Sequence, residues 1–179
     1  MKKLSILEMN RLTPEEFKKC PKIPLTVVLD NIRSLHNVGS IFRTSDAFLI
    51  EKIILCGVTC PPPHPEIHKT ALGAESTVEW IYIKDTMDAI HQLKNKDYYI
   101  YAIEQAHESI YLSDLKLDMN KKYAVVLGNE VKGVQQCVVD DCNDCLEIPQ
   151  MGTKHSLNVS VATGIVLWSF FDQLKSLEK

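Results

Sequence analysis

The chain has 179 residues, of which 45% are hydrophobic and 24% charged, with a net charge of −3. This length and composition suit one globular domain with a sizeable core and argue against disorder. Apolar runs such as 161–166 are too short to span a bilayer, and the start Met1-Lys2-Lys3-Leu4 has no apolar signal core. We therefore expect a cytoplasmic protein with no membrane partner.

The net charge gives no broad positive field that would draw the chain onto nucleic acid. Lysines 2, 3, 18, 19 and 22 cluster near the start, but a solvated face is the commoner explanation of such a cluster. Arginine is scarce, and two of the three arginines, Arg33 and Arg43, lie in one stretch together with Asn31 and Asn37. This concentration of guanidinium groups is more informative than the lysine count.

Six cysteines include Cys142 and Cys145 at the CxxC spacing, which raises the question of disulfides or zinc. A structural zinc site needs four ligands. The other close pair, Cys56 and Cys60, lies at an expected strand end before three prolines. We therefore expect reduced thiols and no metal.

The first predicted element is a short helix that opens with Thr13-Pro14-Glu15-Glu16, a capping box with proline at the first helical position. The helix is expected to end near Cys20 and Pro21. Residues 1–22 are therefore interpreted as an N-terminal helical extension, and residues 23–179 as one domain.

Strands and helices alternate through the rest of the chain. Strands are predicted at 25–29, 52–56, 78–83, 98–103, 123–127 and 145–148. Helices are predicted at 38–48, from the Asp85 cap to Asn95, from after Gly133 to about Cys142, and at 157–177. A rigid proline-rich loop is predicted at 61–65, followed by a short helical or turn piece at 70–74. Several strands are apolar throughout, which predicts an α/β fold with a mostly parallel sheet and helices on both faces.

Three polar stretches follow predicted strands, and ligands of parallel sheets gather at the carboxyl ends of strands. The first, residues 30–44, contains Asn31, Asn37, Gly39 and Arg43. Arg43 lies six residues after Asn37, so both can point toward one site if the helix begins near Asn37. An alternative interpretation makes Asn37 a helix N-cap and Arg43 a solvated residue.

The second stretch, residues 127–133, is a glycine-bracketed loop that leaves a buried strand. Gly128 permits close backbone approach to a ligand, and the Glu130 carboxylate is costly there unless it is paired or exposed to a ligand. The loop has neither the Gly-Lys-Ser/Thr ending of a P-loop nor a GxGxxG pattern. Taken alone, it would also suit an ordinary strand-to-helix turn.

The third stretch, residues 148–162, places Ser156, Asn158 and Ser160 two apart between apolar residues, after a turn that Gly152 favours. A plain core helix would not need these polar side chains. The stretch is typical of a binding site that exposes backbone and a few polar groups in an apolar setting.

In this order and spacing, the three stretches resemble the signature motifs of the SpoU/TrmH family of knotted SPOUT RNA methyltransferases, over about residues 25–170. The resemblance implies an α/β fold whose C-terminal part forms a trefoil knot, an exception to the general absence of knots. It also implies S-adenosylmethionine as methyl donor, a ribose 2′-hydroxyl of tRNA or rRNA as acceptor, and a homodimer with active sites near the subunit interface.

Carried over position by position, the resemblance implies a cofactor pocket shaped by Gly128, Ile148, Met151 and Leu157, with Ile103 as a looser match. It implies a catalytic and acceptor-facing set of Asn37, Arg43, Glu130, Ser156 and Asn158. Arg43 would activate the 2′-hydroxyl by stabilising its developing charge. Asn37 and Ser156 would orient Arg43 or the ribose, Glu130 would hold the knot loop or Arg43, and Asn158 would fix the loop. His155 is an alternative base or a solvent-facing residue.

The chain also departs from the family pattern. Leu49 follows Phe48 where the family usually has glycine, and residues 131–134 are less glycine-rich than in many members. No separate RNA-binding domain fits before Leu25, so we expect a minimal member that docks RNA by shape, by the dimer surface and by Lys69, Lys132 and Lys154. The alternatives are a knotted RNA-binding or assembly module without catalysis, and an unrelated nucleotide-binding α/β domain.

Overall fold

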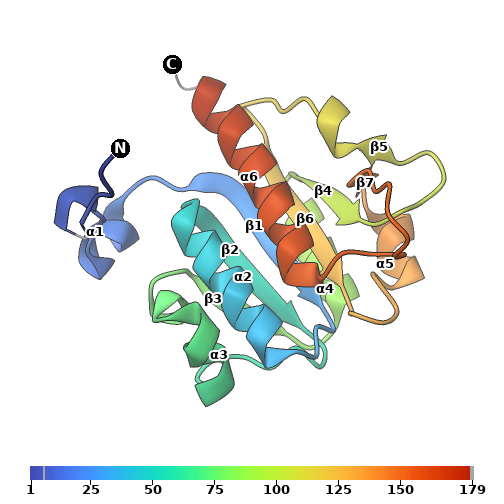
Figure 1. Ribbon diagram of the computed structural model, residues 1–179. Helices are drawn as coiled ribbons and strands as arrows, with labels where there is room; N and C mark the ends of the chain where they lie inside the picture. The colour runs from blue at the N-terminus through green and yellow to red at the C-terminus, as the bar shows by residue number, and fades with distance from the viewer. Residues whose placement is uncertain (6, 178–179) are drawn as a thin grey trace.

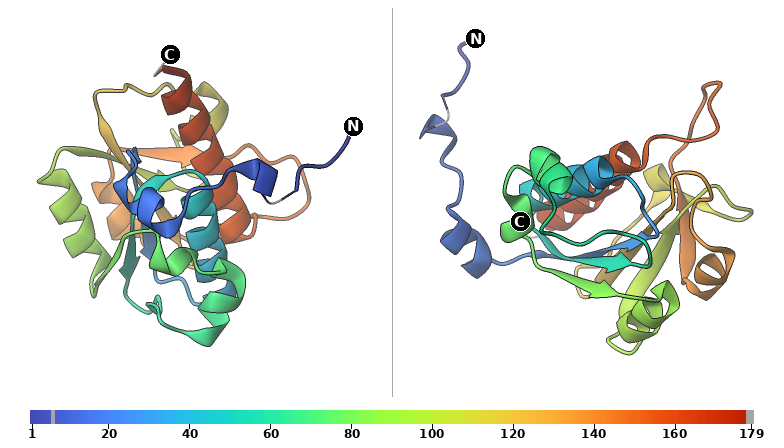
Figure 2. Two further views of the ribbon diagram at one scale, coloured as in Figure 1. Left: turned by 90° about the vertical axis from the view of Figure 1, so that its left-hand side faces the viewer. Right: turned by 90° about the horizontal axis from the view of Figure 1, so that it is seen from below.

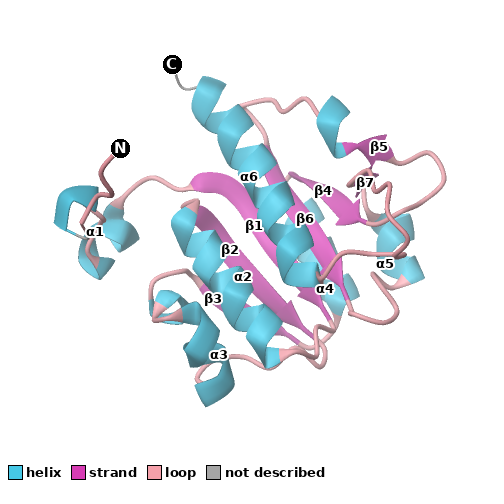
Figure 3. Cartoon of the chain, in the orientation of Figure 1, coloured by secondary structure: helices cyan, strands magenta, loops and turns pink. Residues whose placement is uncertain are grey.

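A seven-stranded sheet forms the centre of the computed structural model, which describes residues 1–5 and 7–177. The strands are β1 (Ile23–Asp30), β2 (Ile50–Cys56), β3 (Trp80–Ile83), β4 (Tyr98–Ile103), β5 (Ile110–Tyr111), β6 (Lys122–Gly128) and β7 (Asp144–Glu147). Their order is β3-β2-β1-β6-β4-β7-β5, and every neighbouring pair is parallel (Figures 1 and 3). The predicted parallel α/β sheet is confirmed.

Helices cover both faces of the sheet, as predicted. The helices are α1 (Pro14–Lys19), α2 (Leu35–Ala47), α3 (Pro65–Ala71), α4 (Thr86–Lys94), α5 (Gln136–Asp141) and α6 (Val159–Leu177). Val27 packs in the core beneath α2, α3 and α6, whereas the adjacent Val28 packs in the core beneath α4 and α5. Because successive side chains of a strand point to opposite faces, a strand covered on both sides is mostly apolar along its length.

Helix α6 closes the larger core. Val166, Leu167 and Phe170 are fully buried, and the Phe170 ring meets Tyr101 and Tyr123 edge-on at centroid distances of 6.1 and 5.8 Å. The helix lies beside α2 on the same face of the sheet (Figure 1). No helix among the described residues combines the length and apolar character that a membrane crossing needs.

The C-terminal part of the fold forms the expected trefoil knot. Strand β7 lies between β4 and β5, although β4 and β5 are consecutive in the chain. Residues 104–109 therefore join β4 to β5 across the strand between them. The chain arrives from α5 on one face of the sheet, runs through β7 and continues to α6 on the other face. This passage through an earlier connection is what a knot requires.

The N-terminal extension reaches away from the domain (Figure 2). Its helix α1 has the predicted capping box: Glu16 N donates to Thr13 Oγ1 at 3.2 Å, and Thr13 N donates to the Glu16 carboxylate at 2.8 Å. Phe17 is buried in the larger core and fastens α1 to the domain. The boundary between residues 22 and 23 stays a prediction, with β1 beginning at Ile23.

Several predicted boundaries were wrong. Helix α2 begins at Leu35 because Ser34 caps it by accepting from Asn37 N, so Asn37 is not the N-cap. Helix α3 begins at Pro65, inside the expected rigid loop, because proline suits a first helical position and His64 Nδ1 accepts from Glu66 N at 3.1 Å. The two-residue strand β5 was not predicted. Leu49 takes a left-handed φ of 53° at the position where the family usually has glycine.

We expect Phe170→Ala to lower the free energy of unfolding by about 3–5 kcal/mol, because it leaves a cavity beneath α6. Met119→Ala serves as the control, since this side chain is exposed and a surface change costs within about 0.5 kcal/mol. Urea unfolding of the two variants measures both values. Equal losses would contradict the assignment of Phe170 to the core.

Candidate functional site

A pocket of about 850 Å³ opens at the carboxyl ends of β4, β6 and β7. Three chain segments line it: residues 103–105 at the end of β4, residues 127–133 at the end of β6, and a third segment from Leu146 in β7 through much of the following loop to Ala162 in α6. The predicted residues Gly128, Glu130, Ile148, Ser156, Leu157 and Asn158 are all among its lining, and so is Ile103. The second and third polar stretches therefore meet at one cavity, at the sheet edge where ligands were expected.

The Glu130 carboxylate joins the first stretch to the second. Its Oε2 accepts from Arg33 N at 3.1 Å, and its Oε1 accepts from Ser34 N at 3.0 Å and from Asn37 Nδ2 at 3.0 Å. The first N–H groups of a helix have no partner within the helix, and the helix dipole favours negative charge at this end. Glu130 therefore holds the N-terminus of α2, and not Arg43 as one of its predicted roles required.

Asn37 and Asn158 extend this link to the third stretch. Asn158 Nδ2 donates to Asn37 Oδ1 at 3.2 Å, so the Asn37 amide bridges Glu130 and Asn158. Asn158 Oδ1 also accepts from Ser160 N at 2.9 Å and from Ser160 Oγ at 2.7 Å, at the start of α6. The hydrogen bonds through Glu130, Asn37 and Asn158 therefore bring all three stretches together. We call these three residues the polar clamp.

Partial burial acts to raise the pKa of Glu130, but the donors at Arg33, Ser34 and Asn37 together lower it below its ordinary value of 4.5. The carboxylate is therefore charged at neutral pH, which is the form that accepts three hydrogen bonds.

The loop after β6 is a tight turn in which Asn129 and Gly133 exchange backbone hydrogen bonds of 3.0 and 2.8 Å. A Cβ at Gly128 would lie 2.0 Å from Gly133 C and Val134 N. Glycine is therefore required at position 128 because the backbone of residues 133 and 134 folds back against it. The sequence had suggested a different reason, the close approach of the backbone to a ligand. Asn129, which the sequence did not single out, donates from Nδ2 to Asn31 O at 2.8 Å and ties the loop to the end of β1.

Asp30 is a second residue that sequence reasoning missed. It is fully buried, and it accepts from Thr86 Oγ1 at 2.6 Å, from Gln135 N at 2.9 Å and from Gln135 Nε2 at 2.8 Å. A carboxylate at the end of an apolar strand was the available signal, because such a group is costly unless it is fully hydrogen-bonded.

In a single chain, three predicted residues do not line the pocket: Asn37, which is joined to it through Glu130 and Asn158, Met151 and Arg43. The Met151 side chain is fully exposed and does not line it. Arg43 is exposed on α2, and among the described residues no hydrogen bond or ion pair holds its guanidinium. Six helical residues place Arg43 about 9 Å along α2 from Asn37 and about 120° around it. Since the Asn37 side chain points toward Glu130 and Asn158, the Arg43 side chain points away from them.

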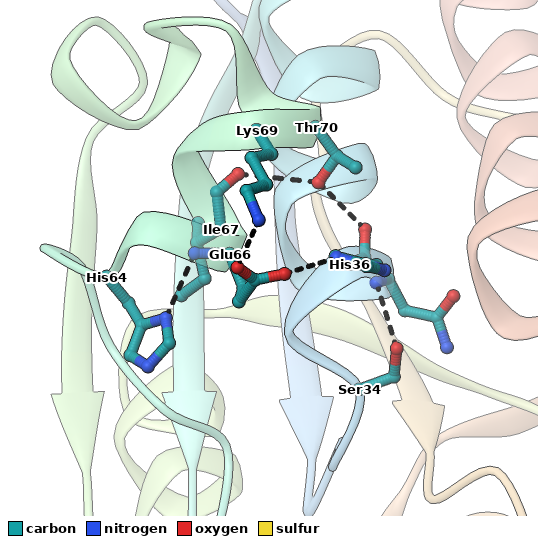
Figure 4. A network of polar contacts seen from close by, with 8 residues as sticks. Ser34, His36, His64, Glu66, Ile67, Lys69 and Thr70 are labelled. Atoms are coloured by element: carbon teal, nitrogen blue, oxygen red, sulfur yellow. Dashed lines mark hydrogen bonds and ion pairs between the residues drawn. The ribbon is translucent and has the colours of Figure 1, made fainter.

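A second polar network joins α2 to α3 (Figure 4). The Glu66 carboxylate contacts Lys69 and lies 2.8 Å from His36 Nε2, and Thr70 Oγ1 donates to His36 O at 3.0 Å. The hydrogen bonds from Lys69 and His36 lower the pKa of Glu66. Lys69, expected to dock RNA, is thus already neutralised by a carboxylate.

Of the CxxC thiols, Cys142 caps the end of α5 and Cys145 lies within β7. Burial raises the pKa of Cys142 to about 12 and also raises the pKa of Cys145, so both thiols are protonated at neutral pH. Among residues 1–5 and 7–177, no group of three or more His, Cys, Asp or Glu side chains is placed to hold a metal ion.

Residues 24–168 match the SpoU rRNA Methylase family, which covers most of the chain. The 23S rRNA (guanosine-2'-O-)-methyltransferase RlmB of Xylella fastidiosa is 31% identical over 145 residues, which are 80% of this chain and 57% of the relative. The chain belongs to the SpoU family of RNA methyltransferases, as its three motifs led us to expect. It spans between 56% and 70% of the lengths of the relatives compared.

Two solved structures share the fold. The TrmH/SpoU tRNA modifying enzyme of A. aeolicus has a TM-score of 0.80 and 28% identity, covering 92% of this chain and 82% of its own. The AdoMet-bound rRNA methyltransferase of Sinorhizobium meliloti has a TM-score of 0.78 and 28% identity, covering 92% of this chain and 62% of its own.

We expect Glu130→Gln to lower the free energy of unfolding by about 0.5–2 kcal/mol at pH 7, because the N-terminus of α2 loses a charged acceptor. The folded-state pKa of Glu130 lies below the ordinary 4.5, so the charged form contributes stability above that pH. The difference between wild type and variant should shrink as the pH falls below about 4.5. Urea unfolding at pH 7 and pH 3 measures it, and a difference independent of pH would contradict the carboxylate's role.

Proposed function

We propose that this protein transfers a methyl group from S-adenosylmethionine to a ribose 2′-hydroxyl of tRNA or rRNA. The observation that carries the proposal is the polar clamp, which assembles the three family motifs around one pocket. Family membership, the 2'-O-methyltransferase named among the relatives and the AdoMet-bound structural neighbour support it. The test is incorporation of labelled methyl groups into unmodified tRNA and rRNA, with mapping of the modified ribose.

The pocket suits the proposed methyl donor. Its volume of about 850 Å³ lies within the range of small-molecule sites. Ile148 and Leu157 offer apolar side chains, and the turn at Gly128 presents backbone groups for polar contacts. Met151 stays a predicted contact, through its backbone, because its side chain points to solvent. S-adenosylmethionine supplies an electrophilic methyl group, so the chain's task is to position the acceptor.

The catalytic assignment is carried over from the family motifs, and the position of Ser156 in the pocket supports it. The new bond forms between the ribose oxygen and the methyl carbon as the carbon–sulfur bond breaks, and the hydroxyl proton passes to solvent water or to His155, which lines the pocket. Ser156 lines the pocket and is placed to orient the ribose. Arg43 faces away from this chain's own pocket, so we assign it to the pocket of a second copy, where its permanent positive charge would stabilise the developing oxyanion.

We expect Arg43→Ala to lower the rate of methyl transfer by a factor of about 10² or more, the usual effect of removing a group that stabilises transition-state charge. Affinity for S-adenosylmethionine, measured by calorimetry, should not change. Arg11→Ala, an exposed arginine in the N-terminal extension, is the matched control and should retain full activity. Undiminished transfer by Arg43→Ala would remove this role and favour activation of the hydroxyl by a base such as His155.

A homodimer is part of the proposal. Helix α6 exposes Val161, Ile165 and Trp168, which recur at helical spacing and continue to Leu157 at the rim of the pocket. Such a continuous apolar stripe marks a docking surface. We propose a second copy of this chain as its occupant, because the stripe borders both the pocket and α2. The ring centroid of Trp168 lies 5.7 Å from that of Phe48, the residue that caps the end of α2. A second copy would thus approach the surface that carries Arg43.

We expect Ile165→Lys to convert the protein to a monomer in sedimentation experiments, because a charge at the centre of the stripe cannot be buried without a partner. Val58→Lys, on an exposed loop, is the control and should leave the assembly unchanged. A wild-type monomer at micromolar concentration, or an Ile165→Lys dimer, would contradict this interface.

The exposed position of Arg43 in a single chain is the observation that would favour the alternative, a knotted RNA-binding module without catalysis. Binding of S-adenosylmethionine with no transfer to any RNA would support that alternative. The cytoplasmic location stays a prediction.

A further inference from the structure

A second hollow, of about 610 Å³, lies where β4 and β6 begin. Because the strands are parallel, this edge of the sheet is opposite the pocket, and a strand of six residues separates the two by about 20 Å. The turn before β4, the segment before β6 and Asn143 line it. The function proposed above makes no use of it.

The hollow concentrates positive charge. Four lysines line it, Lys94, Lys96, Lys121 and Lys122, against one aspartate, Asp97. We call this site the lysine hollow. Lys94 is paired with Asp141 at 2.6 Å, whereas the other three lysines have no ion pair among residues 1–5 and 7–177. The lysines that line the hollow outnumber its lining carboxylates, although the whole chain has a net charge of −3.

Two aromatic rings hold the lysines in place. Lys121 Nζ lies 5.2 Å from the centroid of the Tyr99 ring, and Lys122 Nζ lies 5.7 Å from that of Tyr98. The phenolic groups are engaged elsewhere, Tyr98 with Glu51 and Tyr99 with Asp144. The rings therefore support the ammonium groups and leave them exposed to a ligand.

The pocket at the other edge has no such excess. Its lining lysines, Lys132 and Lys154, are matched by the carboxylates of Glu104 and Glu130. Charge that attracts a polyanion therefore lies away from the site of chemistry.

We propose that the lysine hollow binds the phosphodiester backbone of the RNA substrate, as a second contact about 20 Å from the acceptor ribose. The inference rests on the proposed function. Separate ammonium groups suit successive phosphates, because lysine acts as a point charge without bidentate geometry. An RNA long enough to reach both edges would be bound more tightly than a short one that reaches only the pocket.

The test is the double variant Lys121→Gln/Lys122→Gln in the full chain, with unfractionated tRNA as probe over a range of KCl concentrations. Two lost phosphate contacts should weaken binding roughly tenfold near 0.1 M salt and reduce the slope of log affinity against log salt by about 1.4–1.8. Lys18→Gln/Lys19→Gln, two exposed lysines on α1, is the matched control and should change neither value. Lys96→Gln, in a turn outside any strand, repeats the test where β6 is undisturbed and should reduce the slope by about half as much.

An unchanged salt slope in both hollow variants would overturn the inference, and so would equal losses in the control. Polyglutamate that binds the wild type more tightly than tRNA, and loses affinity in the variant, would instead identify an acidic protein as the partner. Calorimetry with S-adenosylmethionine should give the wild-type affinity in every variant. Wild-type protein that binds tRNA through these lysines but methylates no RNA would contradict the proposed function and leave this inference standing.

Discussion

The assembly of the site depends on one carboxylate at one helix end. Glu130 leaves the sheet after β6 and accepts hydrogen bonds from Arg33 N, Ser34 N and Asn37 Nδ2 at the start of α2. The unsatisfied N–H groups and the dipole of α2 make this a favourable place for negative charge. Asn37 then passes the connection to Asn158 at the start of α6. Segments more than a hundred residues apart are thus fixed around one pocket by a few polar contacts.

The loop that carries Glu130 is itself held from several sides. Glu104 Oε1 accepts from Val134 N at 2.7 Å, which fastens the loop to the knot connection after β4. The buried Asp30 accepts from Gln135 N at 2.9 Å and fastens it to β1. Because these anchors come from rigid strand ends, the pocket rim is preorganised, and catalysis by positioning requires that property. The RNA contact that we propose at the lysine hollow would lie at the opposite edge of the sheet, away from the proposed site of methyl transfer.

Local signals predicted the elements that local chemistry determines. The Thr13 box and the Asp85 cap start α1 and α4 as expected, and β4 spans the predicted residues 98–103. Long-range contacts were not readable from spacing. No residue near Asn37 in the sequence indicates that its amide donates a hydrogen bond to Glu130, 93 residues away. Likewise, the two-residue strand β5 is defined by its pairing with β7. Of the site, the sequence identified the motifs and the family. It could not place Met151 or Arg43 relative to the pocket, because loop path and helix rotation decide where side chains point.

The most direct test of the account is a crystal structure of the protein with S-adenosylmethionine. We expect the donor in the pocket between Gly128, Ile148 and Leu157, inside a knotted chain, with Glu130 still bonded to the start of α2 and to Asn37. A donor bound elsewhere, or an intact pocket in which Glu130 turns away from α2, would contradict the claim that the polar clamp assembles the site.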